Sequence, residues 1–391
     1  MEQNNAVLVL NAGSSSLKFK IFEESNLADI GFGLISGIGT DETKLTMKDS
    51  NKNIVKEEIL DSHLSRDNIL SYVLDTIMKI YPINIKIVGH RVVHGGMKYT
   101  NPVQVTDEVI EYLNSIYSLA PLHNPHNVAP MEIFKKLYPN LIQVACFDTA
   151  FHGTNPNFTR YYPIPRKLID EDKILRYGFH GISYEYIASQ LKAKQPNLYN
   201  GKVVICHLGA GASLCALVNG KSYTTTMGLT PLDGLAMGTR CGSIDPSIIF
   251  YLAKNKNMSL EDIEFMLFNK SGVLGISEKT SDFGKLVKDE DAKCKEAWTV
   301  YSFNVIKHIG SLITAMGGID GIVFTAGVGE NSAKIRKEVA DSLKFLGLEI
   351  DDSLNKENTE IFSTANSKIR MMVIPTQEEL MIAKHSLSFA K

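Results

Sequence analysis

Two strand–turn–strand repeats, about half a chain apart, constrain the fold of this 391-residue chain more than any other feature. The first is VLVLNAGSSSLKFKIF over residues 7–22, and the second is KVVICHLGAGASLCALVNG over residues 202–220. In both, apolar runs flank a turn of small residues whose backbone N–H groups can surround a phosphate. The repeat therefore predicts a duplicated α/β core with one nucleotide-facing hairpin in each half.

Length and charge limit the classes of partner. The chain is long enough for two domains with separate cores. With 44% hydrophobic and 21% charged residues, its composition is typical of a soluble globular protein. A net charge of −2 provides no general attraction to nucleic acid or to an anionic membrane. We therefore expect neither as a partner, and anionic ligands must be held by local charges.

The cysteines and the N-terminus indicate a compartment. The five cysteines are odd in number, form no CxxC pair and lie mostly in apolar runs, so neither a disulfide framework nor a zinc site is expected. The first apolar run lacks a preceding basic cluster, unlike a signal peptide. No segment approaches the roughly 18 apolar residues of a membrane helix. These features predict buried thiols and a cytoplasmic protein.

Apolar periodicity predicts further elements in both halves. Strands are expected at residues 31–35, 44–47, 85–89, 141–147 and 322–325. Residues 65–81 have helical spacing, and Thr106 begins another helix with acidic residues in its first turn. Ser259 and Asp262 resemble a capping box. The repeat places a domain boundary near residue 150.

Two segments combine an arginine with several glycines. In Gly89–Gly96 a strand runs into a group of cationic or titratable side chains that includes Arg91, and functional residues of open α/β sheets gather at strand ends. The segment Met227–Pro246 contains several glycines, two prolines and Arg240, which argues against a long regular element. We interpret both as sites that hold an arginine in place, the alternative being an arginine paired with a surface carboxylate.

Three other side chains have a functional and a structural interpretation. Asp148 follows an apolar strand and is either a Mg²⁺ ligand or a helix cap. His180 lies close to glycines on both sides and either donates to a phosphoryl oxygen or serves structure alone. Glu378 precedes an apolar helix and, without other motifs, would be an ordinary first-turn carboxylate.

A glycine-containing segment follows the strand near residue 322. It reads GIVFTAGVGENS over residues 321–332, which we interpret as a strand, a glycine turn and a helix. The GxG lacks the third glycine of a dinucleotide-binding fingerprint, and no GxxxxGK[ST] is present, so a P-loop is excluded. Gly327 and Gly329 would let the backbone approach a nucleoside and its α-phosphate closely.

Taken together, nine segments resemble the motifs of the acetate kinase family in order and spacing, and they cover nearly the whole chain. They are VLVLNAGSSSLKFKIF, GHRVVHGG, PLHNPHN, FDTAFH, YGFHG, HLGAGAS, MGLTPLDGLAMGTRCGSIDP, FTAGVGENS and IPTQEEL. The resemblance implies an α/β, duplicated actin/hexokinase-like (ribonuclease H-like) two-domain fold with an interdomain cleft. Residues 1–150 would form the N-terminal acetokinase domain, with a C-terminal helix at about 378–391 packing back on it, and 151–377 the C-terminal nucleotide-binding domain.

The resemblance also implies an activity. It is the reversible Mg²⁺-dependent transfer of a phosphoryl group between ATP and acetate, giving acetyl phosphate and ADP, by a cytoplasmic homodimer; Mn²⁺ is the alternative metal. A kinase for propionate or another short-chain acid would differ only in the pocket for the methyl group. A sugar kinase would need an Asp base and polar sugar-binding residues. An actin- or Hsp70-like binding protein would have no use for paired arginines beside a small apolar pocket.

Roles follow from the resemblance at matching positions. The catalytic residues would be Arg91, Asp148, His180 and Arg240. The acetate site would consist of Arg91, Val93, Leu122, His123, Phe179 and Pro231. The nucleotide would be bound by Asn11, Ser14, Ser16, Lys18, His207, Gly209, Gly211, Asp282, Phe283, Gly284, Gly327, Gly329 and Asn331. Asn11 and Glu378 would bind the metal.

The chemistry of these residue types agrees with that activity. A carboxylate acceptor is already ionised at neutral pH, so no general base is needed. Two unit negative charges about 4 Å apart repel by ~1 kcal/mol in water and by ~4 kcal/mol at an effective dielectric of about 20. Two arginines, a donor histidine and a metal would offset this repulsion in the transition state.

The sequence departs from the family pattern mainly on the nucleotide side. Ala210 stands where an asparagine is usual, and Gly284 where an arginine near the adenosine is common. The run after Phe151 differs at Gly153 and Asn155, and the usual GTSH after His180 is altered at Ile182 and Tyr184. These departures therefore bear on nucleotide affinity and preference more than on the phosphoryl chemistry.

Overall fold

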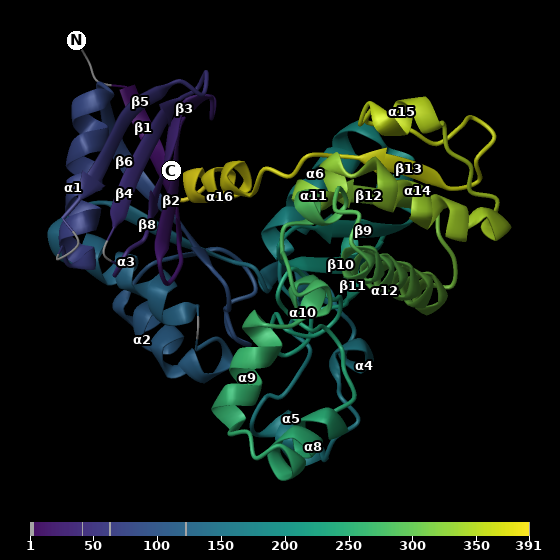
Figure 1. The fold of residues 1–391 in the computed structure, drawn as a ribbon. Coiled ribbons are helices and arrows are strands. Elements are labelled where there is room, and N and C mark those ends of the chain that lie inside the picture. Colours follow the sequence, from purple (N-terminus) through teal and green to yellow (C-terminus); the bar gives the residue numbers. More distant parts are fainter. Residues whose placement is uncertain (1–3, 41, 62–63, 122, 391) are drawn as a thin grey trace. The chain divides into compact units, whose positions relative to one another are not determined.

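A computed structural model describes residues 4–40, 42–61, 64–121 and 123–390 (Figure 1). Contacts between Cα atoms divide the chain into two compact units. Unit 1 consists of Met1–Ala150 together with Gln377–Lys391, and unit 2 of Phe151–Thr376. The chain therefore passes from one unit to the other twice.

Unit 1 contains an eight-stranded sheet in the order β5-β4-β3-β2-β1-β6-β8-β7. Its strands are β1 (Asn4–Ala12), β2 (Ser16–Glu23), β3 (Asp29–Ser36), β4 (Thr43–Asp49), β5 (Ile54–Leu60), β6 (Ile83–Val92), β7 (Val103–Gln104) and β8 (Ile142–Phe147). The pairs from β1 through β5 are antiparallel, while β6 runs parallel to both β1 and β8. Parallel β6 and β8 bring their carboxyl ends to one edge of the sheet.

The first predicted hairpin is present as β1 and β2. Leu10 pairs with Phe19, and Asn11 with Lys18. The turn closes with a hydrogen bond from the backbone N–H of Gly13 to the carbonyl of Ser16, at 2.8 Å. In β2, buried and more exposed residues alternate, as period-2 patterning predicts.

Helices cover the sheet of unit 1. They are α1 (Arg66–Ile80), α2 (Asp107–Ser115), α3 (Asn124–Leu137) and α16 (Glu378–Leu387), with a 3₁₀ turn η1 (Tyr117–Leu119). Helix α16 contacts β1, β6 and β8 (Figure 1). It approaches β6 so closely that a Cβ on Gly89 would lie 2.4 Å from the Ser386 hydroxyl and 2.6 Å from Ile382, which only a glycine avoids.

Unit 2 contains a five-stranded sheet in the order β11-β10-β9-β12-β13. Its strands are β9 (Lys202–Leu208), β10 (Ala212–Val218), β11 (Lys221–Thr225), β12 (Gly321–Thr325) and β13 (Arg370–Val373). Strands β9 and β10 form the second predicted hairpin, and β12 runs parallel to both β9 and β13.

The two sheets share one topology. In unit 1, β3-β2-β1 are antiparallel and β1-β6-β8 parallel; in unit 2, β11-β10-β9 are antiparallel and β9-β12-β13 parallel. The hairpins β1–β2 and β9–β10 occupy equivalent places. In each unit, one helix comes later in sequence than the last parallel strand of the other unit. Helix α6 comes after β8 of unit 1 but contacts β9 of unit 2, and α16 comes after β13 of unit 2 but contacts β6 of unit 1.

Helices of different lengths and the loops between them make up the rest of unit 2. The longer helices are α6 (Gly181–Lys194), α8 (Ser247–Asn255), α9 (Leu260–Asn269), α12 (Ala292–Met316) and α14 (Ala333–Ser342). The short ones are α4 (Asn157–Arg160), α5 (Arg166–Asp170), α7 (Pro196–Tyr199), α10 (Gly272–Ser277), α11 (Phe283–Leu286), α13 (Ala326–Asn331), α15 (Asp352–Lys356), η2 (Ala150–Thr154) and η3 (Lys344–Leu346). Buried strands β9 and β10 contact α12, the longest helix.

The predicted strands and helices are confirmed, with two corrections. Thr106 and Ser259 cap α2 and α9 as expected, each accepting a hydrogen bond from a backbone N–H three residues later. Strand β5 was not predicted, because its centre is charged and its outer face is solvated. The segment predicted as a glycine turn at Gly327 and Gly329 is instead the helix α13.

Two further expectations concern cysteines and membranes. All five cysteines are free thiols, four of them buried. Among the described residues, we find no helix with the length and apolar character that crossing a bilayer requires.

Candidate active site

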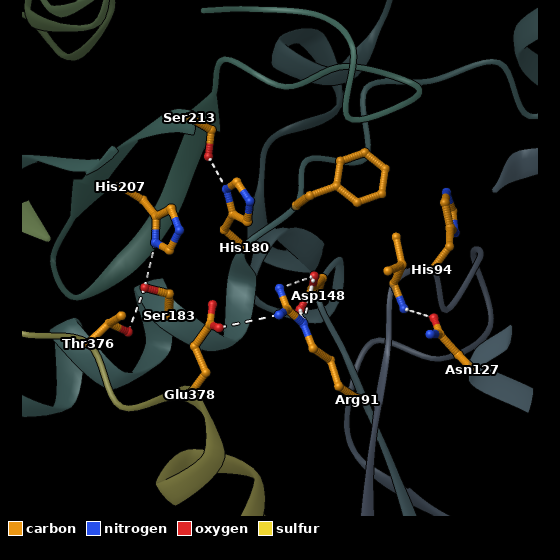
Figure 2. Close-up of polar contacts among 12 residues, drawn as sticks. Arg91, His94, Asn127, Asp148, His180, Ser183, His207, Ser213, Thr376 and Glu378 are labelled. Atoms are coloured by element: carbon orange, nitrogen blue, oxygen red, sulfur yellow. Dashed lines mark hydrogen bonds and ion pairs between the residues drawn. The ribbon is translucent and has the colours of Figure 1, made fainter. Parts of the chain in front are cut away.

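In unit 1 the sheet edge holds a three-membered charge cluster (Figure 2). Arg91 lies near the end of β6 and Asp148 directly follows the adjacent parallel strand β8. The Arg91 guanidinium donates to both Asp148 oxygens, with Nη2 at 2.8 Å and Nε at 3.1 Å, and Nη1 donates to Glu378 Oε2 at 3.3 Å. Glu378 is the first residue of α16, so the packing of α16 on the sheet brings this carboxylate to Arg91.

The positive charge of Arg91 is more than offset by the two carboxylates of this cluster. The Asp148 side chain is 3% exposed, and those of Arg91 and Glu378 are each 17% exposed. Burial alone would lower the pKa of Arg91, but the charges of Asp148 and Glu378 outweigh it and raise that pKa. Arg91 is therefore a permanent cation in a rigid, bidentate contact.

The segment after Arg91 is held by side chains of α3. Asn127 accepts from the backbone N–H of Val93 at 2.9 Å, and Asn124 both accepts from the N–H of His94 and donates to its carbonyl. Asn127 also donates to the carbonyl of Ala12 at the end of β1. The PLHNPHN motif was the only sequence signal for these asparagines, and it assigned them no role.

The histidines beside Arg91 are not part of a cationic group. Burial lowers the pKa of His90 and of His94 to about 4, and His90 Nε2 bonds the Gln143 side chain at 2.9 Å. Both imidazoles are therefore neutral at pH 7. The predicted group of cationic or titratable side chains reduces to one charge, that of Arg91.

The residues predicted to bind acetate fall in both units. Val93 and His123 belong to unit 1, with His123 at the N-cap of α3. Phe179 and Pro231 are buried residues of unit 2. Leu122 lies outside the described residues.

In unit 2, His180 has an unusual backbone conformation and a fixed ring. It caps α6 with φ +58°, in the left-handed region, which costs a non-glycine residue of the order of 1 kcal/mol. Its Nδ1 bonds the hydroxyl of Ser213 at 2.9 Å, and its ring stacks on that of His207 with centroids 4.2 Å apart (Figure 2). His207 and Ser213 are directly paired in β9 and β10, so the second hairpin orients His180.

Arg240 lies in the predicted loop between β11 and α8. Its Nη1 donates to the carbonyl of Pro231 at 3.1 Å and contacts the sulfur of Met237 at 3.7 Å. No salt bridge to Arg240 is found within the part of the chain that the structure describes. Burial lowers the pKa of Arg240, since it holds a cation among neutral acceptors.

His180 and Arg240 converge on the turn of the second hairpin. A Cβ added to Gly211 would lie 3.5 Å from His180 Nε2 and 3.6 Å from Arg240 Nη1. Both donor nitrogens thus face the space beside the Gly211 backbone. Glycine leaves that space open for another group.

A pocket of about 620 Å³ adjoins the same turn. It is lined by Gly209, Ala210, Ser281, Asp282, Phe283, Gly284, Val287, Lys288, Trp298, Gly327, Val328, Asn331 and Ser332. Six of the predicted nucleotide-binding residues are among them, together with both atypical positions, Ala210 and Gly284. Trp298 was not anticipated; its indole is held by a hydrogen bond to Glu338 at 2.9 Å.

Some polar groups of this pocket are already engaged. Asp282 caps α11 by accepting from the backbone N–H groups of Gly284 and Lys285. The Asn331 amide donates to the carbonyl of Gly327. These internal contacts hold part of the pocket wall in shape.

Two residues without a predicted role hold α13 in place. Glu330 accepts from the backbone N–H of Ala326 at 2.7 Å and from that of Thr376 at 3.1 Å. Arg336, which is fully buried, donates to the carbonyls of Gly329 and Glu330, and burial lowers its pKa to about 10. These contacts explain why a segment with two glycines is helical.

The remaining predicted nucleotide residues lie in unit 1. Asn11 is at the end of β1, Ser14 is in the turn, and Ser16 and Lys18 begin β2. Ser14 and Lys18 are exposed, while Asn11 and Ser16 are partly buried. The predicted nucleotide-binding residues are thus divided between the two units.

A metal would find an acceptor at Glu378. Among the described residues, no group of three or more His, Cys, Asp or Glu side chains has the arrangement of a metal site. However, Glu378 Oε1 is buried and has no hydrogen-bond partner within the described chain. Mg²⁺ usually takes one or two carboxylates and completes its shell with waters and substrate phosphates, so this donor set fits it.

Comparison with known proteins decides the family. The family model described as the acetokinase family matches residues 6–384. The chain belongs to the acetokinase family. It is 44% identical to an acetate kinase of Thermoanaerobacterium thermosaccharolyticum over 97% of each chain, and 40% identical to one of Methylocella silvestris over 98% of each.

Solved structures of acetokinases have the same fold. A propionate kinase from Francisella tularensis superposes with a TM-score of 0.93 at 37% identity, covering 98% of this chain and 99% of the other. An acetate kinase from Porphyromonas gingivalis gives 0.91 at 34% identity, covering 99% and 100%. The predicted duplicated actin/hexokinase-like fold is confirmed, and as an acetokinase this chain is a phosphotransferase with a carboxylate acceptor.

Proposed function

We propose that the protein is an acetate kinase that transfers the γ-phosphoryl group of ATP to acetate, reversibly, with Mg²⁺ as cofactor. The observation that carries this proposal is the convergence of His180 Nε2 and Arg240 Nη1 on Gly211, beside the 620 Å³ pocket. Two nitrogen donors close to the same glycine backbone, next to a pocket large enough for a nucleotide, suit a transferring phosphoryl group.

The proposed reaction is direct in-line transfer. A carboxylate oxygen of acetate attacks the γ-phosphorus, and the bond between that phosphorus and the β,γ-bridging oxygen breaks, which releases ADP. No proton is transferred, because the attacking carboxylate is already ionised. Asp148 therefore needs no role as a base, and its bidentate contact with Arg91 supports a positioning role instead.

We assign the charge-neutralising work to two arginines and one histidine. Arg240 and His180 would contact the equatorial oxygens of the transferring group, and Arg91 the acetate carboxylate and the same group. The methyl group would contact the residues assigned to the acetate site, namely Val93, Leu122, His123, Phe179 and Pro231. The nucleotide would lie in the pocket that contains Gly209, Gly327 and Trp298.

Glu378 and Asn11 would hold the metal, and Asp148 would help to position it through its contact with Arg91. When bound, Mg²⁺ would neutralise phosphate charge and orient the phosphates. The unpartnered Glu378 Oε1 supports this assignment.

Trapping the product as a hydroxamate tests the proposal. Protein, MgATP and hydroxylamine are mixed with acetate in one reaction and with propionate in another. We expect acetate to give the larger kcat/KM, because a pocket built for a methyl group discriminates against one extra methylene by roughly 1–3 kcal/mol. A larger value for propionate would assign the protein to the activity named for the Francisella relative, and no product from either acid would reject the proposal.

A second copy of the chain is the partner we propose. Phe250 and Tyr251 on α8, and Leu260 and Phe265 on α9, are each more than half exposed, and the two helices are in contact. Exposed apolar side chains grouped in this way mark interaction surfaces. Sedimentation equilibrium should give a dimer that Phe250→Glu with Phe265→Glu converts to monomers, whereas a monomeric unmodified protein would contradict this proposal.

We also propose that the enzyme works in the cytoplasm. The free thiols support a reducing compartment, and ATP is available there.

A further inference from the structure

In its neutral form, His180 can serve the proposed function in only one of its two tautomers. A neutral imidazole carries one proton, on either Nδ1 or Nε2. His180 Nε2 lies beside Gly211, 3.5 Å from where a Cβ would be, and it can donate to a phosphoryl oxygen there only when it carries a proton. A tautomer with the proton on Nδ1 would present a lone pair to that oxygen and repel it.

A buried chain of hydroxyl groups ends at the opposite ring nitrogen. The Tyr184 hydroxyl bonds the Ser213 hydroxyl, and the Ser213 hydroxyl bonds His180 Nδ1 at 2.9 Å. Tyr184 and Ser213 have no exposed surface. His180 is the N-cap of α6, and Tyr184 lies one helical turn after it. The first turn of α6 therefore positions both end groups of this hydrogen-bonded series, the Tyr184 hydroxyl and the His180 ring.

Counting hydrogens links the direction of these bonds to the tautomer. Each bond contains one hydrogen, and the serine has only one to give. If the tyrosine donates to the serine, the serine donates to Nδ1, which must then be unprotonated. A phenol is a more acidic donor than an aliphatic hydroxyl, which favours this direction.

We infer that Tyr184 is a positioning residue that, through Ser213, keeps the proton of His180 on Nε2. The consequence for catalysis rests on the proposed function, whereas the tautomer is a property of the protein without substrate. Tyr184 is also one of the positions at which the sequence departs from the GTSH run that the family resemblance implies.

Nitrogen NMR of the full-length protein tests the inference directly. With ¹⁵N-labelled histidine rings, the His180 signals are assigned by their loss in His180→Asn. We expect Nε2 to be protonated and Nδ1 not. In Tyr184→Phe and in Ser213→Ala we expect the second tautomer to appear, with kcat about tenfold lower and the KM values for acetate and MgATP within about twofold.

Tyr186→Phe, on the same helix, is the matched control and should change none of these readouts. Phenylalanine at position 184 keeps the edge contacts with the rings of His152 and His207, so that variant should fold. Three results would overturn the inference: a proton on Nδ1 in the unmodified protein, an unaltered tautomer in both variants, or an altered tautomer with unchanged kcat. A proton on Nε2 in a protein that phosphorylates no acid would instead reject the proposed function alone.

Discussion

The two units solve the problem of a buried arginine in opposite ways. In unit 1, Arg91 donates to two carboxylates, Asp148 and Glu378, and its charge is more than offset. In unit 2, Arg240 donates to a backbone carbonyl and a thioether, and no carboxylate is paired with it in the described chain.

The different partners suggest different roles: Arg91 is held in a fixed orientation, whereas Arg240 is able to bind an anion. Arg91 is stable without a ligand, because a bidentate carboxylate contact fixes its orientation. Arg240 retains an uncompensated positive charge at the turn where His180 also points, so an arriving anion gains the full interaction. Similar side chains at similar depth therefore have different consequences when they are removed.

The largest expected effect is on catalysis by Arg240→Ala. We expect kcat to fall about 10³-fold, the size associated with losing one transition-state charge contact. The thermal midpoint should hold or rise slightly, because no carboxylate loses its partner. Hydroxamate formation and thermal unfolding measure the two effects, with Arg166→Ala, in an exposed pair with Asp170, as the control. Unchanged kcat would show that this loop does not take part in the transfer.

The second effect is on stability, in Arg91→Met. Removing Arg91 leaves Asp148 and Glu378 buried without their cation, which should cost at least about 3 kcal/mol of unfolding free energy. The double variant Arg91→Met with Asp148→Asn should recover part of this loss. Urea unfolding measures both. A single variant as stable as Arg240→Ala would remove the contrast between the two arginines.

The third effect is acid sensitivity. His90 has a pKa of about 4 in the folded protein, against 6.5 ordinarily. The unfolded chain thus binds more protons between these values, so His90 contributes stability that is fully present above pH 6.5 and is lost as pH falls toward 4. The free energy of unfolding should therefore fall as pH falls from 6.5 to 4. Replacing His90 and its partner Gln143 with leucine should reduce the slope of the unfolding free energy against pH by up to about 1.4 kcal/mol per pH unit.

Urea unfolding at pH 7, 6 and 5 provides the measurement for this third effect. His385→Gln, at a partly exposed position of α16, serves as the control. An identical slope in the double leucine variant would show that His90 does not contribute.

The smallest effect sharpens the comparison through a ligand. Inorganic phosphate should stabilise the unmodified protein by roughly 1 kcal/mol once its concentration is several times its Kd. Most of this stabilisation should be lost in Arg240→Ala, because the positive charge of Arg240 is not paired with a carboxylate in the described chain. Thermal midpoints over a phosphate series, with chloride at matched ionic strength, measure it. Equal stabilisation of both proteins would place phosphate binding elsewhere.

Local chemistry explains what the sequence predicted well. Both hairpins were expected because their small-residue turns and apolar strands are contiguous in sequence. Strand β5 was missed, since a solvated edge strand carries little hydrophobic pattern. The helix α13 was missed because two glycines indicate a turn, and the side chains that make it helical, Glu330 and Arg336, act through tertiary contacts.

Distance along the chain explains what stayed hidden in the site. Arg91, Asp148 and Glu378 were each named, but their partnership joins residues 57 and 287 positions apart. Burial keeps His90 and His94 neutral, and the local sequence around them does not indicate that burial. Likewise, no local pattern indicates that Ser213 connects Tyr184 with His180.

Because α16 follows unit 2 in sequence but packs on unit 1, the order of synthesis determines when unit 1 can be completed. Residues up to Thr376 can all leave the ribosome while Arg91 still lacks one of its two carboxylates, because Glu378 and the rest of α16 are made after them. Domains fold during synthesis as their segments appear. Only a chain translated past α16 can therefore complete unit 1, and a product truncated near residue 376 would expose the strands that α16 covers.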